Sequence, residues 1–260
     1  MNVFCKISLV VGALVLVLFL LSVKEMPAKP IYGVSFSKFH SDELKLDWKK
    51  VYLALLDDLK VRNFRFSAHW PEIEPQDGKF DFSALDFQMQ EARKRGASVI
   101  LAVGRRLPGW PECHEPEWAQ KLTYEERRQR ILRIVEILIN RYKDFENIKY
   151  WQVENEPFLS LFARPACGPL DKELFEQELA FVRKLDPGKP ILITESGELS
   201  TWRKGYKYGD AVGVSMYLYI WDPHRGPFKY PNIPAIFRIK QNLARLIYGI
   251  FYGQKPVIVA

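Results

Sequence analysis

From residue 31 onward the chain alternates short apolar runs with longer amphipathic segments. After Ser98, the run 98–103 is apolar, which is the pattern of a strand covered on both faces. Seven runs have the length and composition of strands: residues 32–36, 61–67, 98–103, 148–153, 190–194, 211–217 and 256–260. Between them, apolar residues recur every three to four positions, as in helices that bury one side. This period predicts helices over residues 49–60, 83–94, 124–142, 170–185 and 233–250.

Strands that alternate with helices predict a parallel sheet with both faces covered. A doubly wound sheet and a closed (β/α)8 barrel share this pattern. Two features favour the barrel. No Gly-x-Gly-x-x-Gly phosphate-binding loop follows the first strand, and polar and aromatic residues cluster just after strand ends, which in a barrel form one rim. The sequence therefore predicts an α/β fold, an incomplete (β/α)8 TIM barrel with strands 1–7 present and the eighth strand–helix unit missing.

The first 30 residues are interpreted as a targeting segment, separate from a barrel domain over residues 31–260. Residues 7–23 form an uncharged apolar run after Lys6. Its length lies between the core of a signal peptide and the ~20 residues that span a bilayer. Ser22-Val23-Lys24 is a poor cleavage site. We therefore expect an uncleaved membrane anchor with the barrel outside the cytoplasm, and a cleaved signal peptide on a secreted protein is the alternative.

Composition narrows the function classes. An apolar share of 48% can supply one large core, so disorder is not expected. The net charge of +7 is spread out, and its densest basic run, residues 127–130, lies in a predicted helix, so we expect no nucleic-acid partner. Cys113 and Cys167 have no metal-ligand spacing, and we expect no metal. These two cysteines either form a disulfide or stay unpaired.

Polar residues close the fourth predicted strand. Residues 150–157 read Tyr-Trp-Gln-Val-Glu-Asn-Glu-Pro. Burying charge at a sheet core is costly unless partners or a site use it, so Glu154, Asn155 and Glu156 indicate a functional site. Pro157 ends the hydrogen-bonded ladder, which places Glu156 at the C-terminal end of the strand. The alternative is that Glu156 is an ordinary surface carboxylate.

The triplet Asn155-Glu156-Pro157 at the end of a fourth strand resembles the acid/base motif of the clan A glycoside hydrolases. This group of (β/α)8 barrels includes families 5 and 42. The resemblance implies that Glu156 protonates the departing oxygen and that Asn155 hydrogen-bonds the sugar 2-hydroxyl. Two loops after the second strand, residues 70–75 and 78–82, are similar to those of several clan members. The resemblance extends roughly over residues 32–260.

Two further positions follow the same resemblance. Arg65, near the end of the second strand, is similar to an arginine that supports the nucleophile, and Tyr217 matches a tyrosine that bonds it. Arg65 could instead form a structural ion pair with Glu154 or Glu156. Both interpretations are compatible, because an arginine there would also favour the ionised form of a neighbouring carboxyl.

The mechanism implied by the resemblance needs a second carboxylate. A retaining glycosidase holds its two carboxyl groups ~5–5.5 Å apart. In clan A the nucleophile is a glutamate that ends the seventh strand, and here the sequence stops at Ala260 in that strand. We therefore expect the nucleophile just beyond Ala260, in a sequence cut at its C-terminal end, and we expect the chain that ends at Ala260 to be inactive and poorly stable. A real truncation into an inactive protein is the alternative. Glu195, which ends the fifth strand, fits sugar binding or charge tuning better than catalysis.

We therefore expect a monomeric retaining glycoside hydrolase that cleaves a β-linked oligo- or polysaccharide without metal or cofactor. Aromatic side chains can cover the flat apolar faces of sugars while polar groups bond the hydroxyls. The alternatives are a carbohydrate-binding pseudoenzyme with a barrel groove but no nucleophile, and an unrelated α/β enzyme. The fold does not choose the glycan. Besides catalytic Glu156, the candidate substrate-binding residues are Asn155, Arg65, Tyr217, Trp70, Trp110, His69, Glu195 and Trp221.

Overall fold

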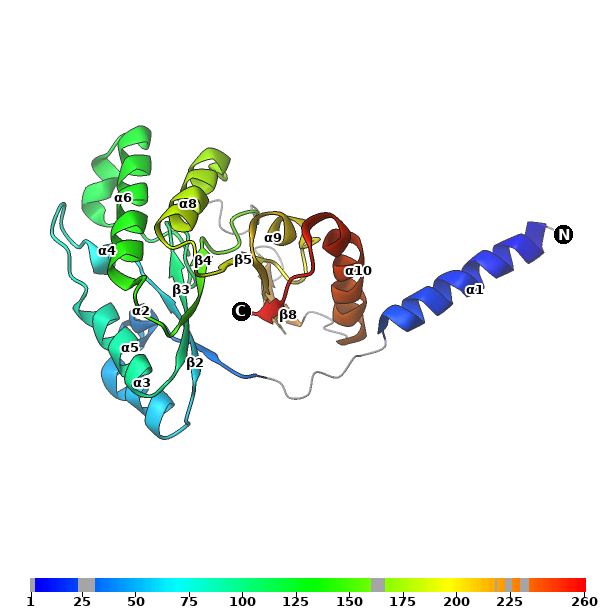
Figure 1. Ribbon diagram of the computed structural model, residues 1–260, viewed down its shortest axis with the longest axis horizontal. Helices are drawn as coiled ribbons and strands as arrows, with labels where there is room; N and C mark the ends of the chain where they lie inside the picture. Colours follow the sequence, from blue (N-terminus) through cyan, green and yellow to red (C-terminus); the bar gives the residue numbers. More distant parts are fainter. Residues whose placement is uncertain (1–2, 23–30, 160–166, 218, 223–225, 230–233) are drawn as a thin grey trace.

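The computed structural model describes residues 3–22, 31–159, 167–217, 219–222, 226–229 and 234–260. Its centre is a seven-stranded sheet in which every neighbouring pair is parallel. The strands follow one another around the sheet in chain order, as in a barrel, and the sheet curls so that helices cover its outer face (Figure 1). In order, the strands are β1 (Val34–Ser35), β2 (Asn63–Ser67), β3 (Ser98–Val103), β4 (Ile148–Val153), β5 (Ile191–Glu195), β6 (Ala211–Val214) and β9 (Val257–Val259). The predicted incomplete (β/α)8 barrel is confirmed.

The register brings the C-terminal ends of the strands to one rim. Ser67 of β2 pairs with Ala102 of β3, and Val103, the last residue of β3, pairs with Val153, the last residue of β4. On the other side Glu195, at the end of β5, pairs with Val214 at the end of β6. Side chains that follow these strands therefore lie around a common opening, as the barrel prediction required.

The outer helices form where amphipathic segments find capping residues. Thr123 and Glu126 form the predicted capping box at the start of α6, in which each side chain accepts from the other residue's backbone. Asp47 and Asp171 cap two others with a single side-chain acceptor each. The helices are α3 (Trp48–Asp57), α5 (Ser83–Lys94), α6 (Tyr124–Tyr142), α8 (Lys172–Leu185), α9 (Arg203–Tyr208) and α10 (Pro234–Tyr252).

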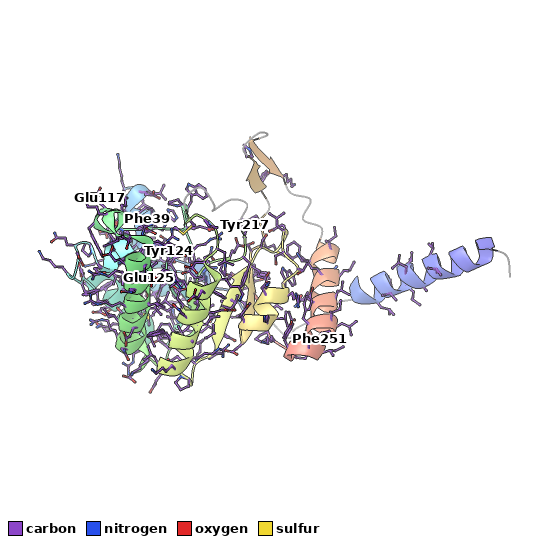
Figure 2. The ribbon with its side chains drawn as sticks, turned by 90° about the horizontal axis from the view of Figure 1, so that it is seen from above. Phe39, Glu117, Tyr124, Glu125, Tyr217 and Phe251 are labelled. Atoms are coloured by element: carbon purple, nitrogen blue, oxygen red, sulfur yellow. A yellow bond between two sulfur atoms is a disulfide. The ribbon has the colours of Figure 1, made fainter. Side chains whose placement is uncertain are left out.

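Shorter elements lie in the loops. Those between strands are α2 (Lys38–Glu43), α4 (Trp70–Ile73) and the 3₁₀ helix η1 (Glu117–Lys121). The predicted strand 211–217 ends at Val214, and an antiparallel hairpin of β7 (Tyr219–Asp222) and β8 (Gly226–Lys229) follows it. Figure 2 shows Tyr217 on the side of the barrel from which this hairpin projects, and Phe251 at the far end of α10.

The core fills the space between the sheet and its helices. Trp151 is fully buried, and its indole N–H donates to Asp186 Oδ2 at 2.8 Å. Tyr52 is likewise buried beneath α5 and donates to the carbonyl of Gln88 at 2.7 Å. A second apolar cluster lies under α9 and α10 and includes Trp202 and Phe237. The polar tips of Trp151 and Tyr52 therefore each have a partner, which offsets the cost of burying them.

The N-terminal apolar run forms the helix α1 (Val3–Ser22). Within the described part of the chain, no helix has both the length and the apolar character that a membrane span requires. The structure thus gives no support to the predicted membrane anchor.

Of the two alternatives for Cys113 and Cys167, the structure shows the disulfide. The bond links the loop after β3 to the segment that precedes α8, across 54 residues of sequence. Both ends lie near the rim. The disulfide therefore ties together two loops that border the opening of the barrel.

Candidate active site

The residues that follow β4 turn sharply at the rim. Glu154, Asn155 and Glu156 have only 7%, 8% and 6% of their surface exposed. Glu154 and Glu156 both adopt a left-handed backbone conformation, with φ of +59° and +44°. Such a conformation costs a residue with a side chain on the order of 1–2 kcal/mol, and residues held in it are concentrated at functional sites. The sequence prediction that this strand end carries chemistry agrees with the strained turn.

The surroundings of Glu156 favour its protonated form. Its backbone N–H donates to Thr194 Oγ1 at 2.8 Å, and its carboxyl hydrogen-bonds the hydroxyl of Ser215. Burial raises the pKa of Glu156, and the negative charges of Glu112 and Glu198 raise it further, against the hydrogen bond from Ser215. Its buried Oε1 has no hydrogen-bond partner among the described residues. A carboxyl of this kind can give a proton to a ligand.

Arg65, Asn155 and Tyr217 surround this carboxyl. The Arg65 guanidinium donates to Asn155 Oδ1 at 3.3 Å. Burial lowers the pKa of Arg65 to about 10, against the opposing effects of Tyr217, Glu156 and Glu112, so it stays a cation at neutral pH. Its buried Nε has no partner within the described residues. Three residues that the family resemblance assigned to the site therefore lie near one another, while their predicted roles toward a sugar and a nucleophile stay predictions.

Glu112 was not predicted, although it joins the same group. Its Oε1 accepts from Asn155 Nδ2 at 3.2 Å, and its Oε2 pairs with Arg106 Nε at 2.6 Å. Glu198, Thr194 and Ser215 were also not predicted. A signal for Glu112 existed, because it follows the end of the third strand, but its loop has none of the residues that carried the resemblance.

The other predicted sugar contacts lie in different surroundings. Trp70 is 1% exposed, and its indole N–H donates to Glu74 Oε2 at 2.9 Å, so its ring has almost no surface for a ligand. His69 is 2% exposed and contacts the carbonyl of Pro108 at 3.2 Å. Trp110, by contrast, is 64% exposed on the loop after β3. The side chain of Trp221 lies outside the described residues.

Glu195 is a buried carboxylate with local partners. It accepts from the Ser200 hydroxyl and from the backbone N–H of Gly205, both at 2.5 Å. Burial raises its pKa, and these two donors lower it. The carboxylate thereby fastens the start of α9 to the end of β5, and its predicted sugar contact stays a prediction.

Glu154 and Glu178 form a pair of buried carboxyl groups next to the turn that follows β4. Both oxygens of Glu154 accept backbone N–H groups, from Arg105 at 2.6 Å and from Arg106 at 2.7 Å. Glu178 of α8 is 1% exposed and shares a hydrogen bond with Glu154, and a cavity of about 60 Å³ adjoins both. Burial raises the pKa of Glu178 well above its ordinary value, and the charge of Glu154 adds to this effect. We therefore assign the anion to Glu154 and the proton to Glu178.

This pair predicts a pH-dependent stability. The folded pKa of Glu178 lies above its unfolded value, so the stability it contributes is present below the unfolded pKa and is lost as the pH rises toward the folded pKa. Glu178→Gln keeps a donor for Glu154 and cannot ionise. We expect it to match the parent near pH 4 and to exceed it at pH 8 by on the order of 1–2 kcal/mol in the free energy of unfolding.

Urea unfolding at the two pH values measures this difference. Glu173→Gln is the matched control, because Glu173 lies on the same helix with a side chain that is 73% exposed. A stability gap between Glu178→Gln and the parent that stays the same at both pH values would contradict the assignment of the proton to Glu178.

Within the described residues, no group of three or more His, Cys, Asp or Glu side chains could hold a metal ion. The side chains of the site supply acid–base and hydrogen-bonding groups. Glu156 supplies a proton, Asn155 and Arg65 supply donors for hydroxyl or carboxylate oxygens, and Tyr217 offers an aromatic face that is 55% exposed.

Comparison with known sequences gives a consistent picture. Residues 44–129 match the model of glycoside hydrolase family 42, described as β-galactosidase. The β-galactosidase Pbg of Clostridium perfringens is 32% identical over 127 residues, which are 42% of this chain and 18% of that protein. The β-galactosidase LacZ of Lactobacillus acidophilus is 28% identical over 105 residues, which are 34% of this chain and 16% of that protein. The chain thus spans less than a fifth of the length of these relatives.

Solved structures show the same barrel. A family 5, subfamily 18 protein of Streptomyces cattleya, in complex with Manβ1-4GlcNAc, superposes with a TM-score of 0.55 at 17% identity over 73% of this chain and 52% of that one. The β-galactosidase of Halorubrum lacusprofundi gives a TM-score of 0.52 at 17% identity, over 75% of this chain and 41% of that one. These identities show the shared fold. The comparisons support the resemblance: part of the chain is similar in sequence to the family 42 β-galactosidases, and its barrel is shared with solved structures of glycoside hydrolase families 5 and 42.

Proposed function

We propose that this protein is a retaining glycoside hydrolase acting on a β-linked glycan, with Glu156 as its acid/base. The observation that supports this most is the carboxyl of Glu156, buried at the rim of the barrel with a raised pKa and an Oε1 that has no partner among the described residues. Glycosidic oxygens are poor leaving groups, and a neutral carboxyl that is buried beside them can protonate them as the bond breaks.

The proposed reaction has two steps. In the first, a carboxylate nucleophile, which the family resemblance implies just after Ala260, attacks the anomeric carbon while Glu156 gives its proton to the departing oxygen. In the second, Glu156 removes a proton from water, which attacks the same carbon and releases the sugar. Asn155 and Arg65 lie where they could hold the sugar hydroxyls and the nucleophile. Trp110, exposed beside the rim, could cover an apolar sugar face.

Hydrolysis of a panel of 4-nitrophenyl β-glycosides by the full-length protein tests this proposal. β-Galactosides are the first choice, because the relatives that match by sequence are named β-galactosidases. We expect turnover of at least one β-glycoside, and NMR should show the β-anomer as the first product. Binding of sugars without hydrolysis of any of them would contradict the proposal and would favour a carbohydrate-binding protein.

We also propose that the barrel works outside the cytoplasm. The support is the disulfide between Cys113 and Cys167, since disulfides persist in oxidising compartments and are rare in the cytosol. The apolar helix α1 fits a leader for export. Alkylation of the protein isolated from its native cells tests this: two protected cysteines support export, and two reactive ones contradict it.

A further inference from the structure

The loop after β3 presents Glu112 in a fixed conformation. The N–H of Leu107 donates to the Glu112 carbonyl at 2.8 Å, and the N–H of Glu112 donates to the Gly109 carbonyl at 2.6 Å. Glu112 has a φ of +70°, in the left-handed region that residues with side chains rarely adopt. The next residue, Cys113, is bonded to Cys167. A strained residue that its surroundings hold from both sides indicates a function for its side chain.

The carboxylate of Glu112 holds the NH₂ end of the Asn155 amide, while Arg65, Gln152 and Thr194 donate to its oxygen, the last two at 3.3 and 3.4 Å. Oε1 of Glu112 accepts from Asn155 Nδ2 at 3.2 Å, and Arg65 Nη2 donates to Asn155 Oδ1 at 3.3 Å. If the amide turned over, its oxygen would face the carboxylate and its NH₂ group would face the guanidinium. Both contacts would then be repulsive, because a carboxylate only accepts and a guanidinium only donates. Arg106 holds the carboxylate in turn, at 2.6 Å.

Glu112 also brings charge to the proton donor. Glu112 is the carboxylate with the larger effect on Glu156, ahead of Glu198, and its charge favours the protonated form. Arg106 acts in the opposite direction, as does the hydrogen bond from Ser215. The charged and titratable groups around Glu156 are Arg65 on β2, Arg106 and Glu112 after β3, Glu198 after β5 and Tyr217 after β6.

We propose that Glu112 is a positioning residue of this site, whose carboxylate orients the Asn155 amide and places a fixed negative charge beside Glu156. The inference rests on the proposed function, in which Glu156 is the proton donor. It goes beyond that function because it assigns two separable effects, one of geometry and one of charge, to a residue on a different loop.

The charge effect is tested by the titration of Glu156 in the full chain. With ¹³C-labelled glutamate and Glu156→Gln to assign the signal, the carboxyl resonance of Glu156 is followed by NMR against pH. We expect Glu112→Gln to move the midpoint to lower pH. The matched control is Glu115→Gln, on the same loop, whose carboxylate pairs with Arg105 at 2.5 Å and should leave the midpoint in place. An unmoved midpoint in Glu112→Gln, or an equal movement in the control, overturns the charge effect.

The geometric effect is tested by activity and by a second variant. Glu112→Asp keeps the charge but shortens the side chain, so the midpoint should stay near that of the parent while the contact with Asn155 is lost. On the full-length protein we expect kcat/KM to fall about 10-fold in both variants, the scale of one hydrogen bond to a charged group, with KM changed less than kcat. Activity equal to the parent in Glu112→Asp overturns the orientation of Asn155 by Glu112.

The titration requires no turnover, so the two proposals can fail separately. If the full-length protein hydrolyses no glycoside but the midpoint moves, the proposed function fails and the charge effect of Glu112 stands. If hydrolysis is found and the midpoint stays in place, the proposed function stands and the role of Glu112 fails. Should Glu112→Gln not fold, Glu112→Asp in the same titration separates charge from shape: a midpoint that moves with the charge retained overturns the charge effect.

Discussion

Replacing Glu156 by Gln in the full-length protein is expected to lower kcat/KM for a β-glycoside with a poor leaving group by about 10²–10⁴-fold. Gln fills the same space but cannot donate a proton that is lost in the transition state. The buried surroundings of Glu156, with the Thr194 hydroxyl at its N–H, are then largely unchanged. Stability should therefore be close to that of the parent, and the loss is one of chemistry. Steady-state kinetics with an alkyl β-glycoside measure it.

The leaving group separates this role from a general disturbance of the site. A 2,4-dinitrophenyl β-glycoside releases an anion that needs no proton, so the first step should lose far less than with an alkyl glycoside. Glu195→Gln is the matched control, because Glu195 is also a buried carboxyl with a raised pKa at a strand end, but its oxygens are held by Ser200 and Gly205. Equal losses on both substrates in Glu156→Gln, or activity close to the parent, would remove Glu156 from the acid/base role.

The sheet was predictable because its pattern is local and repeated. The apolar run 98–103 forms β3, with one face fully buried and the other half-buried up to Ala102, and the helix predicted over residues 83–94 has the bounds of α5. The strand predicted over residues 211–217 ends early for a reason that the pattern does not contain. The backbone N–H of Ser215 donates to the backbone carbonyl of Glu195, and the Ser215 hydroxyl accepts from the N–H of Gly197. After these contacts the chain turns into the site.

The site was predictable only in part, because the sequence indicates which strand ends are polar but not how the loops fold back. Glu156, Asn155 and Arg65 lie together since their strands end at one rim. Glu112 reaches the same place through a left-handed turn in a long loop, and no local pattern announces that turn. The burial of a side chain also depends on residues that are distant in the sequence. Trp70 follows a strand end, but Trp118 packs against its ring and places it in the core.

The loop that follows β5 depends on a close approach between two backbones. A Cβ added to Gly197 would lie 1.8 Å from the carbonyl oxygen of Ser215 and 3.0 Å from the ring of Phe237. No side-chain rotation can relieve the first contact, because the opposing atom belongs to the backbone. The N–H of Gly197 also donates to Ser215 Oγ at 3.1 Å, and Lys240 donates to its carbonyl at 2.5 Å. Gly197 is thus the point at which the ends of β5 and β6 and the helix α10 meet.

Gly197→Ala is therefore expected to destabilise the chain by about 3 kcal/mol or more, the upper range for overpacking a buried position. For a chain of this size that corresponds to a melting temperature about 6–12 °C lower. Since Ser215 must move, its hydrogen bond to Glu156 should weaken, and the pKa of Glu156 should rise. Differential scanning calorimetry measures the first effect and the NMR titration of Glu156 the second.

Gly188→Ala is the control, because its added Cβ would meet Asp186 at an ordinary 3.9 Å, and its stability should be unchanged or slightly higher. If Gly197→Ala were as stable as Gly188→Ala, the ends of β5 and β6 would not approach each other this closely. Ser215 would then not be held in the position from which its hydroxyl hydrogen-bonds the Glu156 carboxyl.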